Sequence, residues 1–344
     1  MKKNKFIKIY VPLIGTEVVD ENFNCKLSSK KDENGLTKVR LQTETIKRFY
    51  TEPFKQAVLK NDKIALLSLI DEMLNNATLF GFKIAKKWLK QEVLPYSIGN
   101  DKIGNDTLIF NCSSALLCPS ALKGHCEVCK CCYAVNNEVV YGMPFVRNLL
   151  SLKRLLTVSI DNLISNTIKL IATDNQKKDG KKAKEALFIR FNSNGDILDD
   201  KMLSDINKFA KELIKDNSNS LKVAYTYTHN KDLNIGIATD ITFNLSYKTD
   251  LKVKKTVIAF KWNKKYLDNS KYVICNGKCF NCPYCKNKDD KRTIVFMAHG
   301  GGFKGLDMLP DGLIDVLNAQ KATDWAIFNA KLVNPSNKQL SDFL

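Results

Sequence analysis

The sequence contains no uninterrupted apolar stretch long enough to cross a lipid bilayer, which would need about 20 residues. Its first segment, MKKNKFIKIYVPLIG, is basic and apolar like a signal peptide, but Lys8 interrupts the apolar run and no small-residue cleavage site follows. We therefore expect no membrane association and a cytoplasmic location. Internal repeats are also lacking, and the one low-complexity segment is the lysine-rich run at residues 176–185.

Acidic residues are few relative to basic ones. The chain has 36 Asp and Glu against 54 Lys and Arg, which gives a formal net charge of +18. Such an excess favours an anionic partner, most simply nucleic acid. The alternative is a compositional bias towards Lys and Asn, with no partner implied. The 344 residues, 44% of them hydrophobic, suffice for one large domain or two ordinary ones.

Cysteine, in contrast, is abundant, with 11 residues. Disulfides are rare in a reducing cytoplasm, so these cysteines are better interpreted as ligands. The spacing Cys126-x2-Cys129-x2-Cys132 allows several sulfurs to converge from one loop, as they do around a soft metal or an iron–sulfur cluster. Scattered buried thiols or disulfides are the less favoured alternative. The full first group comprises Cys112, Cys118, Cys126, Cys129, Cys131 and Cys132.

A second group places Cys275, Cys279, Cys282 and Cys285 within eleven residues. Zinc takes four thiolates at a closed structural site, and a [4Fe–4S] cluster takes three or four, so both metals remain open. The spacing of the first three equals that of the radical S-adenosylmethionine (SAM) signature. Asn281 stands where that signature has an aromatic residue, however, and the motif lies late in the chain. We interpret it as a second, accessory site.

The pattern of apolar residues divides the chain into two parts. Residues 1–106 form a mostly helical extension, in which Asp62 is a plausible helix cap and Pro95 to Asp106 the boundary segment. Residues 107–344 form the cysteine-rich domain, where short apolar runs alternate with helical patterns. The runs are 108–111, 187–191, 223–228, 241–246, 256–260, 272–274 and 294–298; the helices are 145–171, one capped by Asp199 or Asp200, and 311–319.

Alternating strands and helices are typical of an α/β protein with a parallel sheet and crossover helices. The strands are continuously apolar, which fits a sheet covered on both faces. We therefore expect a partial (β/α) barrel of about six mostly parallel strands, with the N-terminal helical extension outside it.

Polar residues follow several of these apolar runs. In parallel α/β folds the carboxyl ends of the strands lie on one edge, so we expect these residues to form one pocket facing the first cysteine group. Taken singly, each has an ordinary explanation: an ion pair for Arg190, a turn or cap for Asp196, a surface position for His229, and a plain turn for the glycines. The candidates are Arg190, Asn192, Asp196, Thr228, His229, Ser246, Gly300 and Gly301.

The order of these motifs resembles the phage "gene product 88" domain. The matching stretches are Cys118-Pro119, Cys129 to Ala134, Arg190 to Asp196, Tyr225 to Thr228, Cys275 to Cys285 and Ile294 to Gly300, so the resemblance runs from about Leu108 to Gly302. Asn192 stands where that family usually has histidine, which removes the basis for proton transfer there. The CxxCYA loop is also similar to phage proteins that look like relatives of radical SAM enzymes. A phage protein would act inside a bacterial host cell.

The resemblance implies a radical SAM-like iron–sulfur protein. Three of Cys118, Cys126, Cys129 and Cys132 would hold a [4Fe–4S] cluster whose open iron binds SAM, and the second group would hold another metal. Arg190, Asp196 and His229 are the catalytic candidates, which would orient SAM or substrate. Asn192, Thr228, Ser246, Gly300 and Gly301 would line the cofactor site, and the basic charge suggests a nucleic-acid substrate. The alternative is a non-enzymatic zinc protein that binds nucleic acid; the sequence sets neither the electron donor nor the oligomeric state.

Overall fold

The structure is a computed structural model. It describes residues 6–11, 15–20, 50–75, 88, 91–100, 103–126, 132, 134–135, 138, 143–175, 186–216, 220–247, 253–259, 268–275, 279 and 282–297. All statements below concern these residues.

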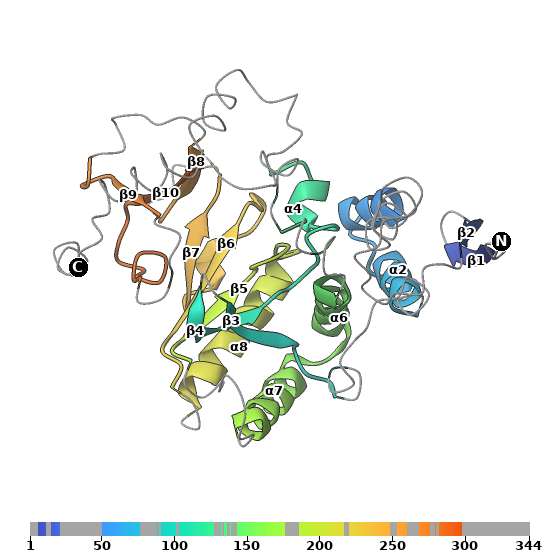
Figure 1. Cartoon of the computed structure of the whole chain (residues 1–344), viewed down its shortest axis with the longest axis horizontal. Coiled ribbons are helices and arrows are strands. Elements are labelled where there is room, and N and C mark those ends of the chain that lie inside the picture. Colours follow the sequence, from blue (N-terminus) through green and yellow to red (C-terminus); the bar gives the residue numbers. More distant parts are fainter. Residues whose placement is uncertain are drawn as a thin grey trace, which may run out of the picture.

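The centre of the molecule is a five-stranded sheet in the order β3-β4-β5-β6-β7. Each strand lies next to its predecessor in the chain (Figure 1). β3 is antiparallel to β4, and the other three pairs are parallel. The strands are β3 (Tyr96–Asn100), β4 (Gly104–Phe110), β5 (Phe188–Phe191), β6 (Val223–Thr228) and β7 (Ile241–Leu245).

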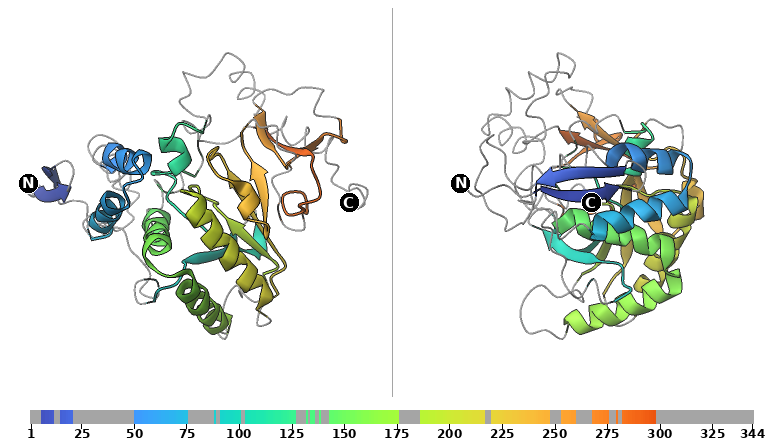
Figure 2. Two further views of the ribbon diagram at one scale, coloured as in Figure 1. Left: turned by 180° about the vertical axis from the view of Figure 1, so that it is seen from behind. Right: turned by 90° about the vertical axis from the view of Figure 1, so that its right-hand side faces the viewer.

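Long connections join the parallel strands, and their helices are α4 (Pro119–Leu122), α6 (Met143–Thr157), α7 (Ile160–Asn175), α8 (Asp200–Lys215) and the short 3-10 helix η4 (Ile235–Ile237). When each parallel strand is added on the same side of the one before it, right-handed crossover connections place the connecting helices on one face of the sheet. Seen from behind, α8 lies across the strands (Figure 2). Its Phe209 packs edge-on against Phe110 of β4 and Phe191 of β5, with ring centroids 5.1 and 6.4 Å away.

Helix α8 shows how local sequence builds this layer. The Asp199 side chain accepts a hydrogen bond from the N–H of Met202 at 2.8 Å, so Asp199 is the residue that caps the helix. Apolar residues follow at helical spacing, and full burial of each large apolar side chain contributes about 1.5–3 kcal/mol. Those that are buried are Met202, Leu203, Ile206, Phe209, Ala210 and Leu213.

The expected single helix over residues 145–171 is wrong, because α6 ends at Thr157 and α7 begins at Ile160. The Ser159 hydroxyl accepts a hydrogen bond from the N–H of Asn162 at 3.3 Å, which is how an N-cap starts a new helix. The apolar spacing continues across the break, so periodicity alone did not show it.

A second, three-stranded parallel sheet has the order β8-β10-β9, with β8 (Thr256–Ala259), β9 (Tyr272–Ile274) and β10 (Thr293–Met297). It lies beyond the β7 edge of the first sheet (Figure 1). A parallel bridge between Leu245 and Lys255 joins the two sheets. The hydroxyls of Ser246 and Thr256, 2.6 Å apart, reinforce this junction.

The N-terminal part contains a hairpin of β1 (Phe6–Val11) and β2 (Gly15–Asp20), a helical segment over residues 50–59, and helix α2 (Lys63–Asn75). Asp62 caps α2 as predicted, since its Oδ1 accepts from the N–H of Ala65 at 2.9 Å. Buried residues of the segment 50–75 share one hydrophobic cluster with the sheet. The predicted division at residue 106 falls inside β4.

The α/β class and a mostly parallel sheet are confirmed. All seven predicted apolar runs contain or overlap a strand, although residues 260 and 298 lie outside the described part. The expected helix over residues 311–319 also lies outside it. The partial barrel itself stays a prediction. In the described part of the chain, no helix combines the length and the apolar character needed to cross a membrane.

Candidate functional site

Strands β4 to β7 run parallel, so the loops that follow them meet at one edge of the sheet. Asp196, in the loop after β5, is the centre of this edge and is 2% exposed. Its Oδ2 accepts from the Ser120 hydroxyl at 2.6 Å and from the N–H of His229 at 2.8 Å. Its Oδ1 accepts from the Thr228 hydroxyl and the N–H of Ile197, both at 2.8 Å. Four protein donors occupy the carboxylate, which suits a residue that positions loops.

The backbone of Asp196 is held as firmly as its side chain. The Ser113 hydroxyl donates to the Asp196 carbonyl at 2.7 Å and accepts from the Asp196 N–H at 2.9 Å. The preceding Gly195 has a φ of +69° and lies so close that a Cβ there would be 2.3 Å from the Ser113 carbonyl oxygen. Glycine at 195 is therefore required for the loops after β4 and β5 to meet.

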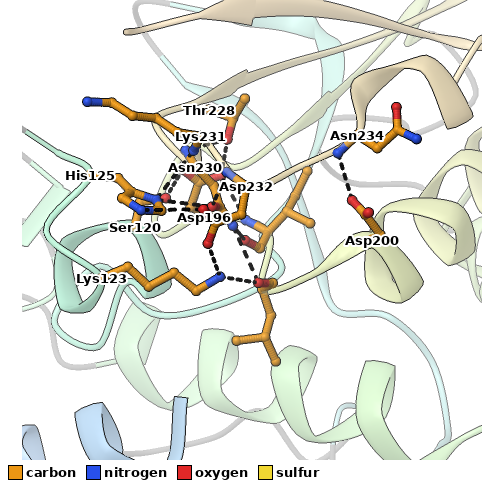
Figure 3. A network of polar contacts seen from close by, with 12 residues as sticks. Ser120, Lys123, His125, Asp196, Asp200, Thr228, Asn230, Lys231, Asp232 and Asn234 are labelled. Atoms are coloured by element: carbon orange, nitrogen blue, oxygen red, sulfur yellow. Dashed lines mark hydrogen bonds and ion pairs between the residues drawn. The ribbon is translucent and has the colours of Figure 1, made fainter. Parts of the chain in front are cut away.

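Helix α4, which follows Cys118, is tied to the same edge (Figure 3). The Lys123 ammonium donates to the Leu198 carbonyl at 3.2 Å and to Asp232 Oδ2 at 3.1 Å. The His125 Nδ1 lies 3.2 Å from Asn230 Oδ1, and its Nε2 lies 3.6 Å from Asp232 Oδ1. These contacts fix the segment between Cys118 and Cys126 against the loops after β5 and β6.

A second buried carboxylate, Glu138, was not predicted from the sequence. It is 1% exposed and accepts from the Ser114 hydroxyl at 2.5 Å, from the N–H of Ala115 at 2.9 Å and from the Asn148 amide at 2.7 Å. Burial raises the pKa of this carboxyl above its usual range, while these donors oppose the rise. Glu138 thus holds the loop after β4 from the side of α6.

Cys118 and Cys132 of the first group are neighbours at this edge, close enough for the charge of one to affect the other. Burial raises the pKa of Cys118, as does nearby Asp196, while the N–H groups of Ala121 and Ser120 bonded to its sulfur lower it. Burial likewise raises the pKa of Cys132, while N–H groups of the two residues at 134 and 135 lower it. Backbone N–H groups directed at sulfur stabilise the thiolate form, which is the form that binds metals.

The other members of the first group are described only in part. Cys112 is fully buried below this edge, and burial raises the pKa of its thiol. Cys126 is disulfide-bonded. Metal binding by Cys126 therefore needs its reduced thiol. The predicted ligand Cys129 lies outside the described part, as does Cys131.

Three further predicted residues lie at or near this edge. The Asn192 side chain accepts from the N–H of Cys112 at 3.1 Å, and its backbone has a φ of +56°, which Asn tolerates better than most residues. Thr228 is 1% exposed and bonded to Asp196, and the N–H of Ser246 donates to the Thr228 carbonyl at 2.9 Å. Their cofactor roles stay predictions, and Gly300 and Gly301 lie outside the described residues.

Arg190 lies on the opposite face of the sheet from α8. Its neighbours Ile189 and Phe191 pack among the core residues, and side chains alternate along a strand. Arg190 pairs in register with Tyr225, and its guanidinium lies 5.0 Å from the ring centroid of Tyr227. It is 9% exposed, and its charge opposes the burial that raises the pKa of both tyrosines.

The second cysteine group packs on this same face. Burial raises the pKa of Cys285 to about 12, although a hydrogen bond with Tyr227 lowers it. The Asn244 amide of β7 donates to the Cys285 carbonyl at 3.0 Å. Burial raises the pKa of Cys282 to about 11, although the N–H of Tyr284, which is bonded to the Cys282 sulfur, lowers this pKa. Cys282 and Cys285 lie within electrostatic reach of each other, and each also of Cys275 and Cys279.

Two buried lysines, which sequence reasoning missed, support this group. Lys286 is 6% exposed; its ammonium donates to the Cys279 carbonyl at 3.2 Å and lies 3.6 Å from Asp106 Oδ2. Lys254, 2% exposed, donates to the carbonyls of Tyr284 and Asn287. Both sat among many lysines in the sequence, and no local pattern marked them as buried.

The donor set of the second group fits a soft metal: four thiols, with N–H and O–H donors directed at two sulfurs. The sulfurs are neighbours without being gathered around one point. Across the residues that the structure describes, no three His, Cys, Asp or Glu side chains stand close enough together to hold a metal ion. Binding would require the four sulfurs to close in.

The fold and these residues define an α/β protein that carries cysteine groups at one edge and on one face of a mostly parallel sheet. Residues 83–249 match the family model described as Gene product 88, which supports a relationship to this phage family over that range. The match covers the five-stranded sheet and the first cysteine group but stops before the second, whereas the sequence resemblance was expected to reach Gly302. No curated protein and no solved structure matches the chain.

Proposed function

We propose that this protein is a radical SAM-like iron–sulfur protein, with a [4Fe–4S] cluster held by Cys118 and Cys132 together with Cys126 or Cys129. The supporting observation is the neighbouring pair Cys118 and Cys132, each sulfur with backbone N–H donors, at the carboxyl edge of parallel strands. That edge is where α/β folds carry their chemistry. When bound, such a cluster supplies the electron that cleaves SAM.

The residues of the chain have separate duties in this proposal. Asp196 and Glu138 hold the loop that carries Cys118 from two sides, so they position the thiols and do not transfer protons. Thr228 and Ser246 lie near the edge on which SAM would bind, and His229 follows Thr228 directly. The joined sheets would continue as a partial (β/α) barrel around this edge.

We propose for Arg190 a duty other than the catalytic one expected from the sequence. Its guanidinium lies over the ring of Tyr227, which is hydrogen-bonded to Cys285, so we assign it to the support of the second cysteine group. A guanidinium there offers a positive charge to a site that four thiolates would make negative.

The alternative is a zinc protein without catalytic activity. The second cysteine group favours it, because four thiols within eleven residues suit a closed tetrahedral site. Zinc at the second group is compatible with a cluster at the first, so metal identity must be determined for each group separately.

The test is anaerobic purification of the full chain under reducing conditions, with iron, sulfide and zinc quantified. We expect iron and sulfide in the unaltered protein, and their loss in the double variant Cys118→Ala/Cys132→Ala. Cys112→Ala is the matched control, because it removes a thiol of the same loop that is not a proposed ligand. Colourless protein with stoichiometric zinc would support the alternative, and iron retained in the double variant would remove the cluster from the first group.

Reduction is a second readout of the same proposal. Because Cys126 is disulfide-bonded, we expect the first group to load iron only after treatment with a thiol reductant. Equal loading with and without reductant would mean that Cys126 is not among the ligands.

A further inference from the structure

A groove of about 800 Å³ opens at the amino-terminal ends of β5, β6 and β7, at the edge opposite the first cysteine group. One wall is the last turns of α8, with Lys211 and Lys215; the other is the segment 282–288 of the second cysteine group. Lys222 and Lys288 also line it, while apolar side chains such as Leu187 and Ile241 contribute to its lining.

The charge of this lysine groove is mostly uncompensated. Lys211, Lys222 and Lys288 are exposed and make no ion pair within the part of the chain that the structure describes. Lys215 is paired with Glu212 at 3.1 Å. Among the described residues of the lining, the acidic one is Asp240, whose carboxylate accepts from the Asn207 amide at 3.0 Å.

We propose that the lysine groove binds the sugar–phosphate backbone of single-stranded nucleic acid. Proteins hold single strands with a positively charged groove that follows the backbone and with aromatic side chains on which bases stack. Here the lysines would contact the phosphates, and Phe188 is an aromatic residue of the lining. Lys211 and Lys215 are one helical turn apart on the same face of α8 and present two charges side by side. The groove thus gathers part of the basic excess of the chain in one place.

The second cysteine group sets the position of one wall. The Thr242 hydroxyl donates to the Lys286 carbonyl at 3.2 Å, and Asn244 donates to the Cys285 carbonyl at 3.0 Å, so the segment is fastened across β7. Lys288 extends from this segment into the groove. Metal bound at the second cysteine group would therefore order this wall and strengthen nucleic-acid binding. This effect of metal rests on the proposed function, whereas the groove itself does not.

The experiment measures binding of the full chain to a fluorescently labelled single-stranded oligonucleotide by anisotropy, over about 50 to about 200 mM salt. We expect the triple variant Lys211→Ala/Lys222→Ala/Lys288→Ala to bind at least about tenfold more weakly at the low-salt end. A plot of log binding constant against log salt concentration should lose about 0.7 in steepness for each lost phosphate contact. The slope for the triple variant should therefore be shallower by about 2.

The matched control is Lys60→Ala/Lys63→Ala/Lys169→Ala, which removes the same charge from exposed lysines elsewhere. Equal losses of oligonucleotide affinity in the two triple variants would mean that binding depends on net charge alone, which would overturn the proposal. Competition by an acidic peptide as effective as that by unlabelled oligonucleotide would overturn the assignment to nucleic acid. If the protein contains no iron but the groove variant still binds the oligonucleotide more weakly than the control variant, the proposed function fails and the proposal for the groove stands.

Discussion

The hydroxyl of Ser120 donates a hydrogen bond to Oδ2 of Asp196 at 2.6 Å, between two buried side chains that are 76 residues apart in the chain. Ser120 belongs to helix α4, two residues after Cys118, and Asp196 to the loop after β5. One short contact thus joins the first cysteine group to the neighbouring strand end. The carboxylate is better understood as the support of this group than as an acid or base.

Replacement of Asp196 by Asn should weaken this support. An amide puts an NH2 group where a carboxylate oxygen accepts two hydrogen bonds, so buried donors lose their acceptor. We expect urea unfolding to show a loss of about 2–3 kcal/mol and reduced iron content. Asp205→Asn is the control, since its exposed pair with Lys201 should contribute no more than about 0.5 kcal/mol. Equal losses in both would contradict the central role of Asp196.

Gly195→Ala should be far more harmful than Gly124→Ala. Both glycines have a left-handed backbone, with φ values of +69° and +74°, so alanine is strained by about 1–2 kcal/mol at either position. A Cβ at 195 would additionally lie 2.4 Å from Ser113 Oγ, whereas at 124 nothing stands within 4 Å. Thermal unfolding should therefore show a small decrease in Tm for the Gly124 variant and a severe one for the Gly195 variant. Similar decreases would mean that the two loops do not meet as described.

Glu72 predicts a pH dependence of stability. Burial raises its pKa from 4.5 to about 6, and the hydroxyl of Tyr50 donates to Oε1 at 3.0 Å. The folded state therefore holds a proton that the unfolded state has released, so this contribution is complete below pH 4.5 and is lost as pH rises through about 6. In Glu72→Gln the unfolding free energy should fall less between pH 4.5 and about 6 than it does in the unaltered protein. The difference should be less than about 1 kcal/mol, because the side chain is partly exposed. Identical pH profiles for the two proteins would refute this account.

Changes at Arg190 should affect the second cysteine group and spare the first. Arg190→Ala removes a largely buried guanidinium from the ring of Tyr227, and we expect the metal of the second group to be held more weakly. Arg190→Lys keeps the charge and should retain part of the binding. Metal analysis in the background of Cys279→Ala/Cys282→Ala isolates the first group, whose metal content should be the same with and without the Arg190→Ala change. If Arg190→Ala lowers the iron content in this background, Arg190 acts on the first cysteine group instead.

Much of the strand and helix pattern could be predicted from local sequence. The runs Val223–Thr228 and Tyr272–Ile274 were placed without error, and Asp62 and Asp199 cap the helices expected of them. Burial on both faces of a sheet demands apolar runs, and capping demands a short polar side chain at one position, so each signal is confined to a few neighbouring residues.

The site was predicted less completely. Asp196 and Thr228 were expected to meet, and they do, because parallel strands end on one edge. Glu138, Lys254 and Lys286 were missed, since a buried charged residue has the same letter as an exposed one and only its partners distinguish it. Arg190 was expected near this edge; it lies in β5, where alternation turns its side chain to the face of the sheet opposite α8.

The sequence by itself determined the local structure: where strands and helices form, which residues cap them, and that thiols cluster in two short stretches. These depend on backbone preferences and apolar spacing over a few residues. Only the tertiary structure decided that Asp196 and Glu138 support the loop of the first cysteine group, and that the second group lies against Tyr227 and Asn244 with lysines nearby. These contacts join residues that are distant in the chain, so they depend on which strands lie side by side and which way their side chains face.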